Sequence, residues 1–126
     1  MSINKINKKK LSVKQLQSKI DKFPRIKIAH TPTPLEEMPN LTKTLNGPKI
    51  WVKREDMTGL VYGGNKARHY EFEMPVIKNE GYDTIINIMD YHSNNARMTA
   101  AAANKTKLKY ILILKNAYNR KIQGNL

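Results

Sequence analysis

A strand–helix–strand order in the second half of the sequence constrains the fold more than any other feature. Residues 84–88 are rich in β-branched side chains, residues 93–105 have helical character with Ser93 placed to cap the helix, and residues 109–114 form a second strand-like run. This order over about 30 residues is typical of a parallel βαβ unit. We therefore predict an α/β fold in which the strand over residues 84–88 is buried on both faces.

The turn between the first of these strands and the helix is a candidate binding site. In βαβ units, ligands bind at the carboxyl ends of the strands, where the start of the next helix faces them. Residues 88–97 lie at this turn and include Ser93 and Asn94. A serine and an asparagine at a helix start can bind a carboxylate or phenolate oxygen with help from free N–H groups. An ordinary capped helix start is the alternative interpretation.

A second candidate site is the glycine-containing stretch over residues 52–68. An apolar run leads into a charged cluster, and a loop with Gly59, Gly63 and Gly64 then precedes Lys66 and a segment with helical spacing. Glycines at such a bend allow positive φ angles and close approach of the backbone to a ligand. The stretch is not a Walker-type phosphate loop, because the spacing is too short and no Ser or Thr follows the lysine.

The amino-acid sequence of this stretch resembles a motif of a known enzyme family. Residues 53–68 read Lys-Arg-Glu-Asp-Met-Thr-Gly-Leu-Val-Tyr-Gly-Gly-Asn-Lys-Ala-Arg. This resembles the D-cysteine desulfhydrase / 1-aminocyclopropane-1-carboxylate deaminase family of pyridoxal phosphate enzymes, as does the Thr-Pro-Leu at residues 33–35. The resemblance implies a partial tryptophan-synthase-β-like fold (fold type II) with parallel βαβ units. It also implies pyridoxal 5′-phosphate as the cofactor and Lys66 as the residue that carries it as a Schiff base.

The turn at residues 92–97 is similar to the Gln-Ser-Asn-His-(x)-Arg motif of the same family. The resemblance implies that Ser93 is catalytic and contacts the substrate carboxylate, while Asn94 contacts the 3′-oxygen of the cofactor. Substrate binding is accordingly assigned to Ser93, Asn94 and Asn95. Cofactor binding is assigned to Lys66, Asn65, Asn94 and His69.

The sequence departs from the family pattern at several of these positions. His92 replaces the glutamine of the motif, and Asn95 replaces its histidine. Residues 88–90 are Ile-Met-Asp where the family has a small, glycine-containing stretch, so bulky side chains crowd the space that a substrate needs. His69 stands where a basic residue usually helps to bind the phosphate.

The chain divides into three predicted parts. Residues 1–22 form a basic N-terminal extension, part of which is predicted to be an amphipathic helix. Residues 23–80 start the large domain that binds pyridoxal phosphate, with a helix at 39–45, a strand at 49–53 and a helix after Lys66 that Pro75 kinks or ends. Residues 81–126 start the small domain. The resemblance covers residues 23–126, far less than the usual family length, so we interpret the chain as a truncated N-terminal portion whose residues 123–126 lead into a further helix.

Composition excludes several other classes of function. The net charge is +13, but residues 1–27 alone hold nine Lys or Arg and one acidic residue, so nucleic-acid binding is not expected as the main function. No apolar run approaches the roughly 18 residues of a membrane span, and we predict a cytoplasmic protein without a membrane partner. The chain has no cysteine, and its three histidines lack ligand-like spacing, so no metal site is expected.

The family resemblance therefore implies a lyase or deaminase of small amino acids, homodimeric when full length. D-cysteine desulfhydrase, which converts D-cysteine to sulfide, pyruvate and ammonia, is the first choice of activity. A 1-aminocyclopropane-1-carboxylate deaminase and a cysteate sulfo-lyase are the alternatives. In another class, the chain is a non-catalytic truncated remnant or one half of a split enzyme. A nucleic-acid binder that uses the basic N-terminal arm is the third possibility.

Overall fold

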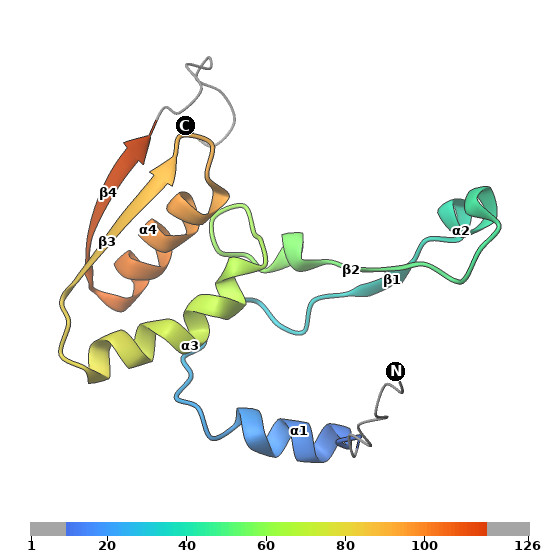
Figure 1. Ribbon diagram of the computed structural model, residues 1–126, viewed down its shortest axis with the longest axis horizontal. Coiled ribbons are helices and arrows are strands. Elements are labelled where there is room, and N and C mark those ends of the chain that lie inside the picture. The colour runs from blue at the N-terminus through green and yellow to red at the C-terminus, as the bar shows by residue number, and fades with distance from the viewer. Residues whose placement is uncertain (1–9, 116–126) are drawn as a thin grey trace, which may run out of the picture.

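The computed structural model describes residues 10–115, and this part of the chain has the α/β fold that the sequence predicts (Figure 1). The helices and strands follow the order α1 (Val13–Ile20), β1 (Leu35–Glu37), α2 (Pro39–Leu45), β2 (Trp51–Lys53), the 3₁₀-helix η1 (Glu55–Met57), α3 (Lys66–Asn79), β3 (Thr84–Asp90), α4 (Asn94–Thr106) and β4 (Lys109–Lys115). The predictions for residues 1–9 and 116–126 lie outside the described residues.

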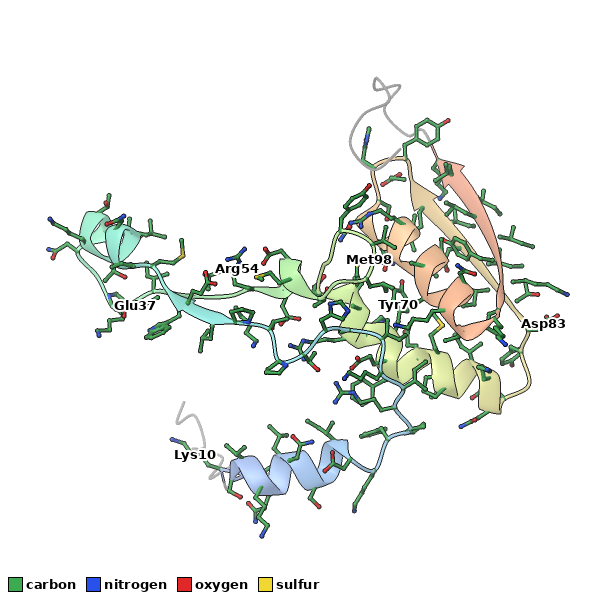
Figure 2. The ribbon with its side chains drawn as sticks, turned by 180° about the vertical axis from the view of Figure 1, so that it is seen from behind. Lys10, Glu37, Arg54, Tyr70, Asp83 and Met98 are labelled. Atoms are coloured by element: carbon green, nitrogen blue, oxygen red, sulfur yellow. The ribbon has the colours of Figure 1, made fainter. Side chains whose placement is uncertain are left out.

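The βαβ unit forms as predicted. Strands β3 and β4 pair in parallel, with Ile86 opposite Ile111 and Ile88 opposite Ile113. Helix α4 connects the two strands and packs against the sheet, and α3 packs against α4. Figure 2 shows Tyr70 of α3 and Met98 of α4 where these two helices meet. Both side chains are buried, and they belong to the hydrophobic core that also includes Met74.

The prediction that the first of these strands is buried on both faces is wrong. Along β3, side chains alternate between the face that α4 covers and an open face, and Ile86 and Ile88 on the open face are 62% and 56% exposed. Ile111 and Ile113 of β4 lie on the same face and are also exposed. The sequence pattern predicted that both faces of β3 are covered. Among residues 10–115, however, no helix or strand covers the face that carries Ile86 and Ile88 (Figure 1).

Helix α3 does not end at Pro75, in contrast to one of the two outcomes that the sequence predicts. It continues to Asn79, and Gly81, with φ of 82°, follows its end. A proline inside a helix cannot donate to the carbonyl four residues earlier, which here belongs to Glu71. The N–H of Ile26 donates to this carbonyl at 2.9 Å, so the carbonyl is satisfied from outside the helix.

The N-terminal half is more extended. Strands β1 and β2 pair antiparallel into a narrow ribbon that carries α2 at its far end and reaches away from the α3–α4 region (Figure 1). The predicted helix at 39–45 is confirmed as α2, and the predicted strand at 49–53 is present over its last three residues as β2. The proposed domain boundary near residue 80 stays a prediction.

Helix α1 confirms that part of the N-terminal extension is helical. Ser12 caps it in a capping box: its Oγ accepts the N–H of Gln15, and the Gln15 side chain accepts the N–H of Ser12. The helix buries none of its residues and lies apart from the other helices and strands (Figure 1). None of the helices in residues 10–115 has the length and apolar character needed to span a membrane.

Candidate functional site

The loop before Lys66 has a backbone that glycine alone adopts without strain. We call residues 58–65 the lysine loop. Gly63 and Gly64 have φ of 75° and 137°, and a Cβ on Gly63 would lie 1.6 Å from the carbonyl oxygen of Asp56. The N–H of Gly64 donates to the carbonyl of Glu55 at 3.0 Å. The last residues of the loop therefore contact η1, the 3₁₀-helix that directly precedes the loop.

Two larger residues of the lysine loop share this unusual backbone. Val61 and Tyr62 have φ of 39° and 58°, a region that a β-branched residue such as valine rarely enters. The guanidinium of Arg97, in the first turn of α4, lies over the Tyr62 ring at 5.4 Å. Such a cation–π contact is favourable and links the loop to α4. Strained residues of this kind cluster at functional sites, where the surrounding structure holds them in place.

The lysine loop lies directly against the start of α4. A Cβ on Gly64 would lie 2.8 Å from the Met98 Sδ and 2.9 Å from the Asn94 Nδ2. Lys66 follows two residues later as the first residue of α3. The structure therefore brings together the segments that carry two of the predicted site residues, Lys66 and Asn94. The glycine is what permits this approach, because any side chain at position 64 would occupy the space between the two segments.

Lys66 is half-buried, and within residues 10–115 its Nζ has no hydrogen-bond or ion-pair partner. Asn65, the residue before it, is exposed and provides no side-chain cap for α3. An amine that is not held in an ion pair can react with a carbonyl carbon, provided that it is deprotonated. The arrangement is therefore compatible with a lysine that forms a covalent bond to a ligand.

Ser93 caps α4, as the sequence predicts. Its Oγ accepts the N–H of Ala96 at 3.2 Å and lies 3.7 Å from the Met89 Sδ. The amide of Asn95 also lies 3.9 Å from the same sulfur. Met89 therefore occupies the space beside two of the predicted substrate-binding residues, Ser93 and Asn95.

A buried hydrogen-bond network holds Asn95. The Tyr70 hydroxyl donates to the Asn95 Oδ1 at 2.6 Å and is also bonded to the hydroxyl of Thr99. Asn87 of β3 donates to the Thr99 Oγ1 at 3.2 Å. Burial raises the pKa of Tyr70, so its hydroxyl stays protonated and able to donate at neutral pH. The sequence alone gave no sign of this network, because Tyr70 and Asn95 are 25 residues apart and belong to different helices.

Asn94 makes its contacts within its own helix. Its Nδ2 lies 3.6 Å from the Met98 Sδ, and its Oδ1 accepts a hydrogen bond from the Arg97 guanidinium. These contacts orient the Asn94 amide beside Gly64. The amide lies at the helix start, where the first N–H groups lack partners within the helix.

His69 lies in a different environment. Its side chain is 54% exposed, and its Nε2 lies 2.8 Å from the Glu73 Oε1, one helical turn later. Together with Asn95 and Tyr70, it lines a cavity of about 590 Å³ between α3, β3 and α4. Lys66 and Ser93 do not line this cavity; Ser93 lines a separate hollow of about 450 Å³ with Met89 and His92. The predicted site residues are thus divided among the Gly64–Asn94 contact and two hollows.

An ion-pair cluster supports the lysine loop from its other side. Arg68, two residues after Lys66, donates from Nε to the Glu55 Oε2 at 2.6 Å, and Thr33 donates to the Glu55 Oε1 at 2.7 Å. The hydrogen bonds from Arg68 and then Thr33 lower the pKa of Glu55, so this carboxylate stays charged. The cluster joins the segment before β1, η1 and the first turn of α3. Arg54 and Asp56 form a separate, exposed ion pair.

The two segments that meet at the Gly64–Asn94 contact carry donors whose chemistry suits the ring end of pyridoxal phosphate. Lys66 offers an amine without a competing partner, and Asn94 offers an amide at a helix start. An amine condenses with an aldehyde, and amide and N–H donors suit a phenolate oxygen or a carboxylate. In residues 10–115 no group of His, Asp and Glu side chains is arranged to hold a metal ion.

Comparisons with known proteins show the family to which the chain belongs. Residues 26–124 match the model of the pyridoxal-phosphate-dependent enzyme family. The chain is 43% identical over 96 residues to a Pyrococcus abyssi protein named provisionally as a 1-aminocyclopropane-1-carboxylate deaminase, covering 76% of this chain and 29% of that protein. It is 41% identical over 97 residues to the D-cysteine desulfhydrase of Salmonella newport, covering 77% of this chain and 29% of the relative.

A solved structure shows the same fold. The crystal structure of an ACC deaminase homologue matches with a TM-score of 0.72 and 36% sequence identity, over 77% of this chain and 30% of that one. The chain thus spans slightly less than a third of the length of the relatives that it matches. Because the family model covers most of the sequence and the fold agrees, this chain belongs to the family of pyridoxal-phosphate-dependent enzymes.

Proposed function

We propose that this chain supplies the cofactor-binding lysine of a lyase or deaminase that acts on small amino acids, with D-cysteine as the first-choice substrate. The observation that carries the proposal is the contact of Gly64 with Asn94, which joins the loop before Lys66 to the helix start that follows β3. One segment provides a reactive amine and the other provides neutral donors. This is the combination that binding a cofactor aldehyde and an amino-acid carboxylate requires.

Each predicted site residue has a defined task in this proposal. When bound, pyridoxal phosphate supplies a carbonyl carbon that condenses with amines and a ring that stabilises a neighbouring carbanion. Lys66 would hold the cofactor through Nζ, and the free amine would accept a proton from the substrate carbon at the same atom. Ser93 and the start of α4 would bind and orient the substrate carboxylate.

The remaining assignments concern binding. Asn94 holds the ring oxygen of the cofactor, and Asn95, fixed by Tyr70, faces the substrate. Asn65 precedes the lysine and contributes to the cofactor pocket. His69 is assigned to the phosphate, and for this its imidazole must exchange Glu73 for the phosphate as its partner.

The relatives do not separate the two leading candidate substrates. Proteins named for D-cysteine desulfhydration and for deamination of 1-aminocyclopropane-1-carboxylate match at nearly equal identity, so identity alone does not choose between them. β-Elimination from D-cysteine yields sulfide, pyruvate and ammonia, whereas ring opening of the cyclopropane yields 2-oxobutanoate and ammonia. Cysteate, which would release sulfite, is the third candidate. We expect the enzyme to act as a cytoplasmic homodimer.

A non-catalytic role is the candidate of a different class. Met89 lies beside Ser93 and Asn95, and the isoleucine face of the β3–β4 sheet is exposed. Both observations favour a remnant, or a subunit that works only with a complementing chain. Co-purification with a polypeptide that carries the remaining part of the family fold would support the second form.

Borohydride trapping tests the proposal directly. The purified chain is incubated with pyridoxal phosphate, reduced with borohydride and mapped by peptide mass spectrometry. We expect the pyridoxyl label on Lys66, its loss in Lys66→Ala, and no change in Lys78→Ala, which removes an exposed lysine of the same helix. Label scattered over many lysines and unchanged in Lys66→Ala would contradict the proposal.

Turnover then identifies the substrate. A chain that labels on Lys66 is supplied in turn with D-cysteine, 1-aminocyclopropane-1-carboxylate and cysteate. Sulfide released from D-cysteine would support the first choice, and 2-oxobutanoate would support the deaminase instead.

A further inference from the structure

Thr58 makes an unusual pair of hydrogen bonds within the lysine loop. Its side chain is fully buried, and its Oγ1 contacts both polar main-chain atoms of Gly64. The hydroxyl accepts the N–H of Gly64 at 2.9 Å and donates to the carbonyl of Gly64 at 2.8 Å. The Gly64 N–H also donates to the Glu55 carbonyl at 3.0 Å, so the Thr58 hydroxyl and the Glu55 carbonyl together orient a glycine whose φ of 137° is open to few other residues.

The orientation of Gly64 determines where α3 begins. The carbonyl of Gly64 also accepts the N–H of Ala67 at 3.4 Å, so it forms part of the first turn that carries Lys66. On its other side, Gly64 lies against Asn94 and Met98 of α4. A rotation of this glycine would therefore displace the Lys66 amine relative to the start of α4.

Thr58 is itself held rigidly. Its main-chain carbonyl accepts the N–H of His30 at 2.8 Å, which ties the lysine loop to the segment before β1. No water is needed to satisfy its hydroxyl, since Gly64 provides both an N–H donor and a carbonyl acceptor. The threonine is thus a fixed support between the extended N-terminal segment and the residue that precedes Lys66 by two positions.

We propose that Thr58 is a positioning residue for Lys66: it contacts neither substrate nor cofactor, but its hydroxyl sets the Gly64 peptide and so aims the Lys66 amine at the Asn94 end of α4. The reactive role of this amine rests on the function proposed above. The positioning itself is a property of the loop without any ligand. A misplacement of about 1 Å can slow a reaction by about a hundredfold, so a fixed loop matters for the chemistry.

Three variants distinguish the effect of the Thr58 hydroxyl from the effect of its side-chain packing. Thr58→Val keeps the shape and removes both hydrogen bonds, whereas Thr58→Ser keeps the hydroxyl and removes a methyl group. Thr106→Val is the matched control, because Thr106 is also buried but donates to the Ala102 carbonyl within its own helix at 2.8 Å. Circular dichroism establishes that each variant is folded.

Two readouts are measured on the full chain. The first is the hydrogen-exchange rate of the Gly64 amide by NMR, which requires no cofactor. The second is the share of label on Lys66, relative to the other lysines, after reaction with pyridoxal phosphate and borohydride across a range of pH. Acetic anhydride, which modifies amines without a cofactor, is used in parallel.

In Thr58→Val we expect the Gly64 amide to exchange faster, because only the Glu55 carbonyl remains as its acceptor, and the share of label on Lys66 to fall about tenfold. Thr58→Ser should restore both values, and Thr106→Val should change neither. Unchanged Gly64 exchange in Thr58→Val would overturn the inference. Faster exchange combined with an unchanged share of either label on Lys66 would also overturn it, because the loop would then not aim the amine.

The two proposals fail in different ways. If Lys66 of the wild-type chain takes no pyridoxyl label, the proposed function fails, and the acetylation pattern together with Gly64 exchange still decides the role of Thr58. If Thr58→Val does not fold, Thr58→Ala, which removes the same hydroxyl, provides the decision by the same two readouts. Values equal to those of the wild-type chain would overturn the inference.

Discussion

Pro75 and Ile26 are coupled through one carbonyl group. Because Pro75 has no N–H, the carbonyl of Glu71 lacks its usual partner within α3, and the N–H of Ile26 donates to it at 2.9 Å. The side chain of the same Glu71 accepts the N–H groups of Ile28 and Ala29 at 3.0 and 2.9 Å. A single helical residue thus accepts three main-chain N–H groups from residues 26–29, and the proline leaves its carbonyl open to the first of them.

Removal of the Glu71 carboxylate should therefore destabilise the chain strongly. Glu71 is almost fully buried and also pairs with Arg25. We expect Glu71→Ala to lower the free energy of unfolding by about 3 kcal/mol, since two buried N–H groups and a guanidinium lose their acceptor. Urea titration followed by circular dichroism measures the change. Glu73→Ala, two positions later and exposed, serves as the control and should cost less than about 0.5 kcal/mol; equal losses in the two variants would contradict this reading.

The same carboxylate should make stability depend on pH. Burial raises the pKa of Glu71, but the N–H of Ala29, the Arg25 guanidinium and the N–H of Ile28 together outweigh burial, so the pKa lies below its ordinary value of 4.5. A carboxyl with a lowered pKa contributes stability that is present above the ordinary pKa and is lost as the pH falls through the folded-state value. We expect the free energy of unfolding to decrease below about pH 5 and to decrease less steeply in Glu71→Gln. Identical slopes for both chains would exclude this assignment.

The sequence predicted the local elements well because their signals are local. Ser93 capped a helix where a cap was expected, and the β-branched runs formed the parallel pair β3–β4. Pro75 shows where such reasoning ends. Its effect on α3 depends on a donor 49 positions earlier in the sequence, which no local pattern identifies. A tertiary contact outweighed the local preference of proline to end a helix.

For the candidate site, too, the sequence identified the residues but not the contacts between them. Lys66 and Ser93 stood out because motifs mark them, and the glycines of the lysine loop indicated a tight bend. The contacts that hold these residues were not predictable, since they join distant segments: Gly64 to Asn94, and Tyr70 to Asn95. The supporting role of Thr58 likewise depends on a loop closure that is visible only in three dimensions.

The closure of the lysine loop gives a further prediction, at Gly63. A Cβ at this position would lie 1.6 Å from the Asp56 carbonyl, and its φ of 75° disfavours any side chain. We expect Gly63→Ala to lower the free energy of unfolding by about 2 kcal/mol or more and to abolish selective labelling of Lys66. Thermal unfolding and borohydride trapping measure the two effects. Gly47→Ala is the matched control, because its Cβ would meet nothing closer than 3.7 Å; a Gly63→Ala chain as stable as this control would refute the closed loop.

Two adjacent isoleucines of β3 allow the open face of the sheet to be tested. Ile85 packs against the buried core, whereas Ile86 is 62% exposed opposite Ile111 of β4. Threonine keeps the β-branched shape and removes apolar surface, so the two substitutions differ mainly in the burial of the side chain. We expect Ile85→Thr to cost about 1–2 kcal/mol of unfolding free energy and Ile86→Thr less than about 0.5 kcal/mol. Ile86→Thr should instead lower the fluorescence of a bound hydrophobic dye, which reports exposed apolar surface. If the two substitutions cost the same, the isoleucine face is covered in solution, and the burial on both faces that the sequence predicted would apply to the assembled protein.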